Sequence, residues 1–535
     1  MTTDLRVFPF PIDADDAEAV EKVGRSLPEP RRGNGGDDVD AIYTSPDLPT
    51  ASDAGWRAIE RANRPEWLFQ KGGIPVRLGS DDEARTRLET LNLDKFRYVV
   101  ARVAPWKTKT KNKKTGEIQE TAAKPPKDVI ADMLAYPSDR MPLPIVSRIT
   151  DVPTVAFDGM ICDRPGYNPA NKTYYAPAAG LVIPEFPEYP IEEDIRRAVQ
   201  TIVEPFADFS FKGDADLAHL VSLAILPFAR DLICGPTPFH LADAPIHGSG
   251  KTLSFQTALY PGTGGNYGPM AQTTEEELRK KITTEILAGR PIVFLDNISR
   301  EIDSSNLSMA ITSPYWFDRV LGKQVDVTLP MRLIFVGTGN NVILSGEIAR
   351  RTVRVRIDPN TDEPWRREGF RIPNLRGWVH EHRGELVAAI LTLIRAWVLD
   401  GKPAWPGRAL GSFEEWSRVL GGILERAGIG GFLENLDELY EQADLEGATW
   451  KTFVTAWWEA HKTAAVGTAD LFPIAEKIDT LDLGKGTTDK SQRTVLGKKL
   501  WAKKNRVVAG YKITLGTKAH RLNQWHLIPT SGGVR

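Results

Sequence analysis

Cysteine is nearly absent from this chain, which has only Cys162 and Cys234 among its 535 residues. Two cysteines exclude a disulfide framework and a cysteine-rich metal cluster, and they favour a reducing compartment, so we expect a cytoplasmic protein. The sequence lacks any apolar run of about 18 residues and any apolar leader, which predicts no membrane span and no signal peptide. The net charge of −2 excludes an overall polycation, so nucleic-acid binding would need local basic segments.

The strongest pattern present is an apolar run, a glycine-rich loop and a helical pattern in direct succession. Residues 239–242 (Phe-His-Leu-Ala) form a short, mostly apolar run, the loop ends in Gly-Ser-Gly-Lys-Thr, and the residues after Thr252 follow a helical pattern. A glycine-rich turn aims backbone N–H groups inward, and the helix N-terminus behind it favours negative charge. This order predicts a phosphate-binding loop. One departure is Pro245, which stands where the usual pattern G-x-x-x-x-G-K-[ST] has its first glycine.

Each residue of this loop has an expected role. Lys251 would reach the β- and γ-phosphates of ATP, and the Thr252 hydroxyl would bind Mg²⁺. The alternative is a chance Gly-Lys-Thr turn, which the strand before it and the helix after it disfavour. The expected nucleotide-binding residues are His247, Gly248, Ser249, Gly250, Lys251, Thr252 and Leu253.

A second buried run, residues 290–297, ends in Asp296 and Asn297. An apolar strand with a carboxylate at its end is typical of a parallel sheet that faces a ligand with its carboxyl edge. We expect Asp296 to hold Mg²⁺, as in the Walker B motif. Asn297 stands where many such enzymes have a glutamate base, so the base stays open, although Asn297 could position a water. The alternative for Asp296 is a turn residue at a strand end.

Further polar residues follow the next apolar strand, residues 332–336. Asn340 is expected to contact the γ-phosphate or the attacking water, which is the sensor-1 position. Arg350 and Arg351 come after a short helical turn, and we predict that they act on the nucleotide of a neighbouring subunit as an arginine finger. The alternative for this pair is a surface salt bridge. Between these motifs, residues 316–327 are predicted to form two strands around a Leu-Gly-Lys-Gln turn.

Two segments carry local positive charge. Five lysines lie within residues 107–114, and this run is either a solvated loop or a contact to a phosphate backbone. Residues 485–521 hold eleven Lys and Arg against one acid, with a helix at 491–503 and two later β-like runs, 507–515 and 523–528. A helix followed by a basic hairpin suggests a winged helix on duplex DNA. The expected DNA contacts there are Arg493, Lys498, Lys499, Lys503, Lys504 and Lys512.

Taken as a set, these motifs resemble AAA+ ATPases, and among them superfamily 3 and MCM-like helicases. The resemblance is carried by HGSGKT (247–252), FLDN (294–297), DRVLGK (318–323), GTGNN (337–341), GEIARR (346–351) and the run 410–435. It is similar to the helicase part of primase-helicases from phages, plasmids and integrated elements. The resemblance implies a hexameric ring that uses ATP and Mg²⁺ to move along DNA, with Lys323 on a hairpin that meets the single strand in the channel. A separate primase is a possible partner.

The expected fold class is therefore an α/β P-loop AAA+ core, with a parallel sheet and a hairpin before sensor 1. We expect a disordered tail (1–40), an N-terminal α+β domain (41–190), the ATPase domain (191–360), a helical lid (361–465) and a winged helix (466–535). Within the N-terminal domain, residues 67–69, 74–78 and 96–103 are predicted as strands, and a helix is expected to begin at Ser52.

The predicted function is an ATP-dependent DNA helicase or translocase in the replication of a mobile element. Two alternatives stay open. One is an AAA+ ATPase that remodels proteins without unwinding DNA, which an aromatic pore loop would favour. The other is an origin-binding initiator with weak ATPase activity, against which Lys251, Thr252 and Asp296 argue.

Overall fold

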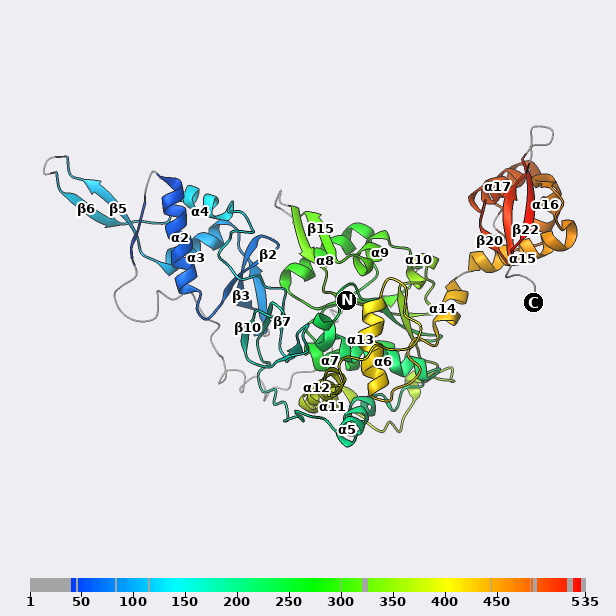
Figure 1. Ribbon diagram of the computed structural model, residues 1–535, viewed down its shortest axis with the longest axis horizontal. Coiled ribbons are helices and arrows are strands. Elements are labelled where there is room, and N and C mark those ends of the chain that lie inside the picture. The colour runs from blue at the N-terminus through cyan, green and yellow to red at the C-terminus, as the bar shows by residue number, and fades with distance from the viewer. Residues whose placement is uncertain are drawn as a thin grey trace, which may run out of the picture. The chain divides into compact units, whose positions relative to one another are not determined.

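The computed structural model divides the chain into two units, residues 1–436 and 437–535 (Figure 1). Of the expected N-terminal tail, only Asp40 is among the residues described. In the described part of the chain, no helix combines the length and apolar character needed to cross a membrane. The structure describes residues 40–44, 47–81, 84–113, 116–299, 301–319, 326–443, 445–481, 483–484, 488–516 and 523–530.

The first unit is built on five parallel strands in the order β13-β14-β17-β12-β18. These strands are mostly buried along their length, as expected for a parallel sheet that helices cover on both faces. The order places β17 between β12, which leads into the glycine-rich loop, and β14, which carries Asp296. The bounds are β12 Phe239–Ala244, β13 Pro269–Met270, β14 Ile292–Ile298, β17 Ile334–Asn340 and β18 Thr352–Arg356.

Helices surround this sheet. Helix α8 precedes β14 and begins after Thr274, whose hydroxyl accepts a hydrogen bond from the Glu277 backbone N–H at 3.4 Å. Three glutamates in its first turn complement the helix dipole. The helices and 3-10 turns are α5 Glu192–Val203, η1 Glu204–Phe206, α6 Asp214–Ala229, η2 Arg230–Leu232, α7 Lys251–Thr263, α8 Glu275–Ala288, α9 Ser305–Thr312, α10 Gly346–Ala349, η3 Pro364–Arg366, α11 Leu375–Glu381, α12 Arg383–Leu399 and α13 Glu414–Arg426.

The described residues before α5 mix small sheets with the helices α2, α3 and α4 around an apolar core. The prediction of a strand at 96–103 is wrong, because this segment is the helix α3. Asn92 caps α3 by accepting from the Lys95 backbone N–H at 2.9 Å. The elements are β1 Ile42–Tyr43, α2 Leu48–Ala62, β2 Leu68–Lys71, β3 Ile74–Ser80, β4 Thr86–Thr90, α3 Leu93–Val103, β5 Trp106–Lys111, β6 Ile118–Ala122, α4 Lys127–Leu134, β7 Arg148–Thr150, β8 Thr154–Val155, β9 Ile161–Cys162, β10 Gly166–Asn168 and β11 Thr173–Tyr175.

Another correction concerns α2, which begins at Leu48 with Asp47 as its N-cap, while Ser52 lies buried inside the helix. This N-terminal part is joined to η2, which precedes β12, by a largely buried ion pair between Arg148 and Asp231 at 2.8 Å. Pairing satisfies two charges that would otherwise be costly to bury.

A separate antiparallel hairpin, β15 (Tyr315–Arg319) and β16 (Asp326–Pro330), stands between α9 and β17 in the chain. Its base is fixed because the buried Trp316 indole donates to the Thr283 hydroxyl at 2.8 Å. The two strands predicted within 316–327 are present, and Arg319 on β15 faces Asp326 on β16 with an N–O distance of 3.3 Å. The predicted tip residue, Lys323, lies outside the described residues.

The C-terminal unit combines helices with a four-stranded sheet in the order β19-β22-β21-β20. The boundary expected between residues 465 and 466 differs from the observed division, because α15 supplies Trp450, Phe453 and Trp457 to the core of this unit. The expected strand 507–515 is interrupted by a turn, so it forms β20 and β21. The elements are α14 Leu436–Ala443, α15 Leu445–His461, β19 Val466–Gly467, α16 Thr468–Ala475, α17 Asp489–Ala502, β20 Val507–Val508, β21 Tyr511–Leu515 and β22 Gln524–Pro529.

Candidate nucleotide-binding site

The glycine-rich loop lies where the sequence predicted it, between β12 and α7. Gly248 and Gly250 have positive φ angles of +73° and +86°, which residues with a Cβ atom rarely adopt. A Cβ at Gly250 would also come within 2.9 Å of the Phe209 ring. Pro245 has no positive φ, so proline is compatible with the loop at the position of the usual first glycine. The two glycines therefore give the loop a backbone conformation that residues with a Cβ rarely adopt, as the predicted phosphate-binding loop requires.

Lys251 is the first residue of α7 and is buried beside this loop. Its ammonium donates to the Ile246 carbonyl at 3.1 Å and to the Asn340 side-chain oxygen at 2.7 Å. Burial lowers the pKa of Lys251, and Arg356 adds to that effect, whereas Asp243 opposes it. A phosphate would favour the charged form of this lysine, because an opposite charge restores what burial removes.

The carboxylate of Asp296 accepts two hydrogen bonds at one oxygen. Thr252 donates at 2.8 Å and Thr338 donates at 2.6 Å. Hard oxygen ligands of this kind suit Mg²⁺, which usually binds one or two protein groups and keeps water and phosphate oxygens for the rest. The donor set therefore fits the predicted ion, with Thr252 and Asp296 as its protein contacts.

Asn340 joins the loop to the tip of β17. Because a lysine ammonium can only donate, the Asn340 oxygen must face Lys251, and its amide nitrogen donates to His247 Nδ1 at 2.7 Å. The Nδ1 atom of His247 is therefore the acceptor of this hydrogen bond. These two hydrogen bonds bring Asn340, the residue predicted for the sensor-1 position, into contact with the glycine-rich loop and with Lys251.

Asn297 has a backbone role besides any chemical one. It has a φ of +54°, its N–H donates to the Thr338 hydroxyl at 3.2 Å, and the β14–β17 register shifts between Leu295 and Ile298. Asparagine tolerates the left-handed region better than glutamate does. The bulge thus gives a structural reason for asparagine here, and the exposed side chain could still meet a water.

Arg350 and Arg351 do not join the phosphate loop. They precede β18, whose first residue Thr352 pairs with Phe239 at the start of β12. The loop follows the other end of β12, about 17 Å away at 3.3 Å per residue. Arg350 Nε donates to the Gly346 carbonyl at 3.1 Å, and Arg351 pairs with Glu347 at 3.2 Å.

Two further charged residues near the loop escaped the sequence analysis. The buried Asp243 on β12 forms an ion pair with Arg356 and accepts from the Val342 backbone N–H at 3.1 Å. Arg356 also donates to the Asn341 side-chain oxygen at 3.0 Å. The sequence signal that could have identified Asp243 is an aspartate within an otherwise apolar strand. These contacts fix the turn after Asn340 beside the phosphate loop.

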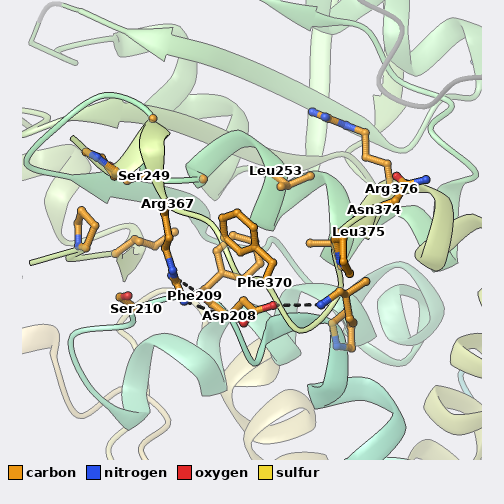
Figure 2. Close-up of a pocket in the computed structure, with 18 residues that line it drawn as sticks. Asp208, Phe209, Ser210, Ser249, Leu253, Arg367, Phe370, Asn374, Leu375 and Arg376 are labelled. Atoms are coloured by element: carbon orange, nitrogen blue, oxygen red, sulfur yellow. Dashed lines mark hydrogen bonds and ion pairs between the residues drawn. The ribbon is translucent and has the colours of Figure 1, made fainter. Parts of the chain in front are cut away.

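A cavity of about 460 Å³ adjoins the glycine-rich loop, as Figure 2 shows. Its walls are largely apolar, and Leu253 from the predicted set is among them. Arg367 donates to the Asp208 backbone carbonyl at 2.6 Å, and its guanidinium lies 5.2 Å from the centre of the Phe370 ring. Such a lining suits a flat, apolar-faced group such as a purine base. No sequence pattern indicated Phe209, Arg367 or Phe370. Phe209 precedes the first strand of the sheet in the sequence, and Arg367 and Phe370 follow its last strand, β18.

The predicted DNA contacts of the C-terminal unit lie on or next to α17, except Lys512 on β21. Arg493 pairs with Asp489 at 3.4 Å and lies over the Phe472 ring. Lys503 and Lys504 lie over the rings of Trp450 and Trp501 at 5.6 and 4.9 Å. Arg493 and Lys498 are exposed, whereas Lys503, Lys504 and Lys512 are half-buried like Lys499.

Neither a protein-family model nor a curated protein matches this chain. A solved structure of JCV helicase is 16% identical, with a TM-score of 0.23 over 49% of this chain and 64% of that chain, less than two thirds of its length. A JCV helicase structure with a bound acetamide compound is also 16% identical, with a TM-score of 0.21 over 71% of that chain. At such TM-scores the likeness carries no argument, so the proposed function depends on the site geometry.

Proposed function

We propose that this chain is an AAA+ ATPase that binds Mg²⁺–ATP at the loop between β12 and α7. The observation that carries the proposal is the convergence of Lys251, Thr252, Asp296 and Asn340 at the carboxyl edge of three parallel strands. Lys251 would neutralise phosphate charge, Thr252 and Asp296 would hold a Mg²⁺ ion that supplies further positive charge, and Asn340 would orient the γ-phosphate or water. Positioning and charge stabilisation of this kind are what phosphoryl transfer requires of a protein.

The cavity beside the loop would take the base and ribose of the nucleotide. It adjoins Gly248 and Gly250 on one side and the segment after β18 on the other. The strand order supports the AAA+ assignment, because β17 with its polar tip separates β12 from β14. Arg350 and Arg351, at the opposite edge of the sheet, are proposed to serve the nucleotide of a neighbouring copy in a hexameric ring.

ATP turnover is proposed to drive movement along DNA, that is, a helicase or translocase of a mobile genetic element. The order helix, short strand, two helices and hairpin strands in α15–β22 supports a winged helix with a basic α17. The hairpin β15–β16 would carry Lys323 to a strand in the ring channel.

The test is ATP turnover with and without DNA, beside strand displacement on a forked duplex. We expect turnover that requires Mg²⁺, rises with DNA and accompanies unwinding. Turnover that ignores DNA, with no displacement, would favour a protein-remodelling ATPase. Duplex binding with negligible turnover would favour an initiator.

A further inference from the structure

The hairpin of β5 and β6 in the N-terminal part extends beyond the core on which its base packs. Its base is anchored by Trp106, which is 4% exposed in the N-terminal core, and by pairing of β1 with β5. Beyond the base, β6 is exposed at all five of its residues, and β5 is exposed from Lys109 to Lys111. Figure 1 shows this hairpin reaching out past α2 and α3. Because neither face packs on a core, burial cannot account for it.

Charge is distributed unevenly over the hairpin. Lys107, Lys109 and Lys111 alternate along β5 and therefore share one face, with Lys113 following at the tip. The Glu120 carboxylate on that face is shared by Lys107 at 3.2 Å and Lys109 at 3.7 Å. A hydrogen bond from Tyr43, followed by one from Lys107, lowers the pKa of Glu120, so it stays ionised. Lys107 and Lys109 therefore share the single negative charge of Glu120.

The outer lysines differ from the inner pair. Among the described residues, no acidic side chain lies within ion-pair distance of Lys111 or Lys113. The opposite face presents uncharged hydroxyls: Thr108, which meets Thr44 at 2.6 Å, and Thr110. Lysines and hydroxyl groups are the usual sequence-independent contacts to phosphate oxygens.

We infer that the β5–β6 hairpin is a binding surface for the phosphate backbone of duplex DNA. This inference rests on the proposed action on DNA and adds a contact site far in the chain from α17. A six-residue strand spans about 20 Å, and a two-stranded ribbon fits the major groove, which is about 12 Å wide. Single-stranded partners are usually held by exposed aromatic rings, and the aromatic ring beside the lysine face, Tyr43, is covered by Lys109 at 3.9 Å.

The test compares the full-length chain with the double variant Lys111→Gln/Lys113→Gln. Fluorescence anisotropy of a labelled duplex gives the slope of log Kd against log salt concentration. Two lost phosphate contacts should reduce that slope by about 2 and weaken binding at low salt. The matched control is Lys127→Gln/Lys172→Gln, which removes the same charge from exposed lysines of the same unit and should keep the wild-type slope.

A single strand of equal length should show a smaller change than the duplex. An unchanged duplex slope, an equal loss in the control, or an equal loss on the single strand would overturn the inference. ATP turnover without DNA, measured on the same preparations, should be equal in all three proteins, because the hairpin supplies no residue to the nucleotide site. If the wild type shows no ATP turnover, that result would count against the proposed function. The salt slopes of DNA binding could still be compared, because they are measured independently of turnover.

Discussion

The ammonium of Lys251 donates a hydrogen bond of 2.7 Å to the side-chain oxygen of Asn340, which ties the first residue of α7 to the last residue of β17. A phosphate in the loop would offer Lys251 a stronger, charge-assisted partner. The same amide would then be released towards the γ-phosphate or the attacking water. In the proposed function, this relationship would link nucleotide occupancy of the site to the position of Asn340.

Replacement of Asn340 by alanine should separate binding from hydrolysis. We expect kcat to fall on the order of 100-fold, because one preorganised polar group is lost from the transition state. The Kd of ATP should change only a few-fold, since Lys251 and the loop N–H groups stay in place. Single-turnover hydrolysis and fluorescent-nucleotide titration measure the two quantities. Equal losses in both would show that Asn340 acts through ground-state binding.

Acid should destabilise the first unit through His219. This buried ring hydrogen-bonds the Arg354 carbonyl at 2.8 Å and accepts from the Leu433 N–H at 3.0 Å, and burial lowers its pKa to about 4. The unfolded chain, with a histidine pKa of about 6.5, therefore binds a proton that the folded chain does not. The destabilisation by His219 should be absent above pH 6.5. Between pH 6.5 and pH 4 it should lower the free energy of unfolding by up to about 1.4 kcal/mol per pH unit.

The variant His219→Gln tests this sign. The variant should be less stable than the wild type at pH 7. Between pH 6.5 and 4, however, its free energy of unfolding should fall less steeply than that of the wild type. Denaturant titrations across that range provide the measurement, and the neighbouring His240, whose pKa burial lowers to about 3, contributes to the slope in both proteins. A variant with the full wild-type slope would assign the acid sensitivity elsewhere.

Arg350 and Arg351 should act between subunits. A Lys251→Ala chain and an Arg350→Ala/Arg351→Ala chain are each expected to be inactive alone. In mixed rings some interfaces combine an intact phosphate loop with intact arginines, so ATP turnover should partly recover. Failure to recover, with subunit exchange demonstrated by a fluorescent label, would count against a shared site.

Lys323 should matter for unwinding and not for basal turnover. We expect Lys323→Ala to abolish strand displacement and DNA stimulation while leaving ATP turnover without DNA nearly intact. Arg319→Ala is the matched control, because it removes a cation from the same hairpin. Its pair with Asp326 is 66% and 84% exposed and is worth at most about 1 kcal/mol. Normal displacement by the Lys323 variant would make this lysine a loop residue without a role.

Much of the nucleotide site could be predicted because its parts are local patterns at strand ends. Lys251, Asp296 and Asn340 each follow an apolar strand, and parallel strands bring their carboxyl ends to one edge. The pair Asp243–Arg356 could not be predicted, since it joins residues 113 positions apart. The cavity wall at Phe209 and Phe370 likewise depends on how the chain returns to the loop.

The misassigned helix α3 shows a different limit. Val99 and Val100 made the run 96–103 resemble a strand, but Phe96, Val99, Val100 and Val103 are buried at helical spacing. The cap at Asn92 was the signal that would have decided between the two periods. Periodicity over eight residues alone does not distinguish them.

The central claim, that ATP is bound and hydrolysed at the loop of Lys251, is tested most directly by ATP turnover of the wild type and of Lys251→Ala at saturating Mg²⁺. The wild type should turn over ATP, and the variant should lose turnover while its circular dichroism spectrum stays that of the folded protein. Wild-type turnover by a folded Lys251→Ala protein would contradict the account.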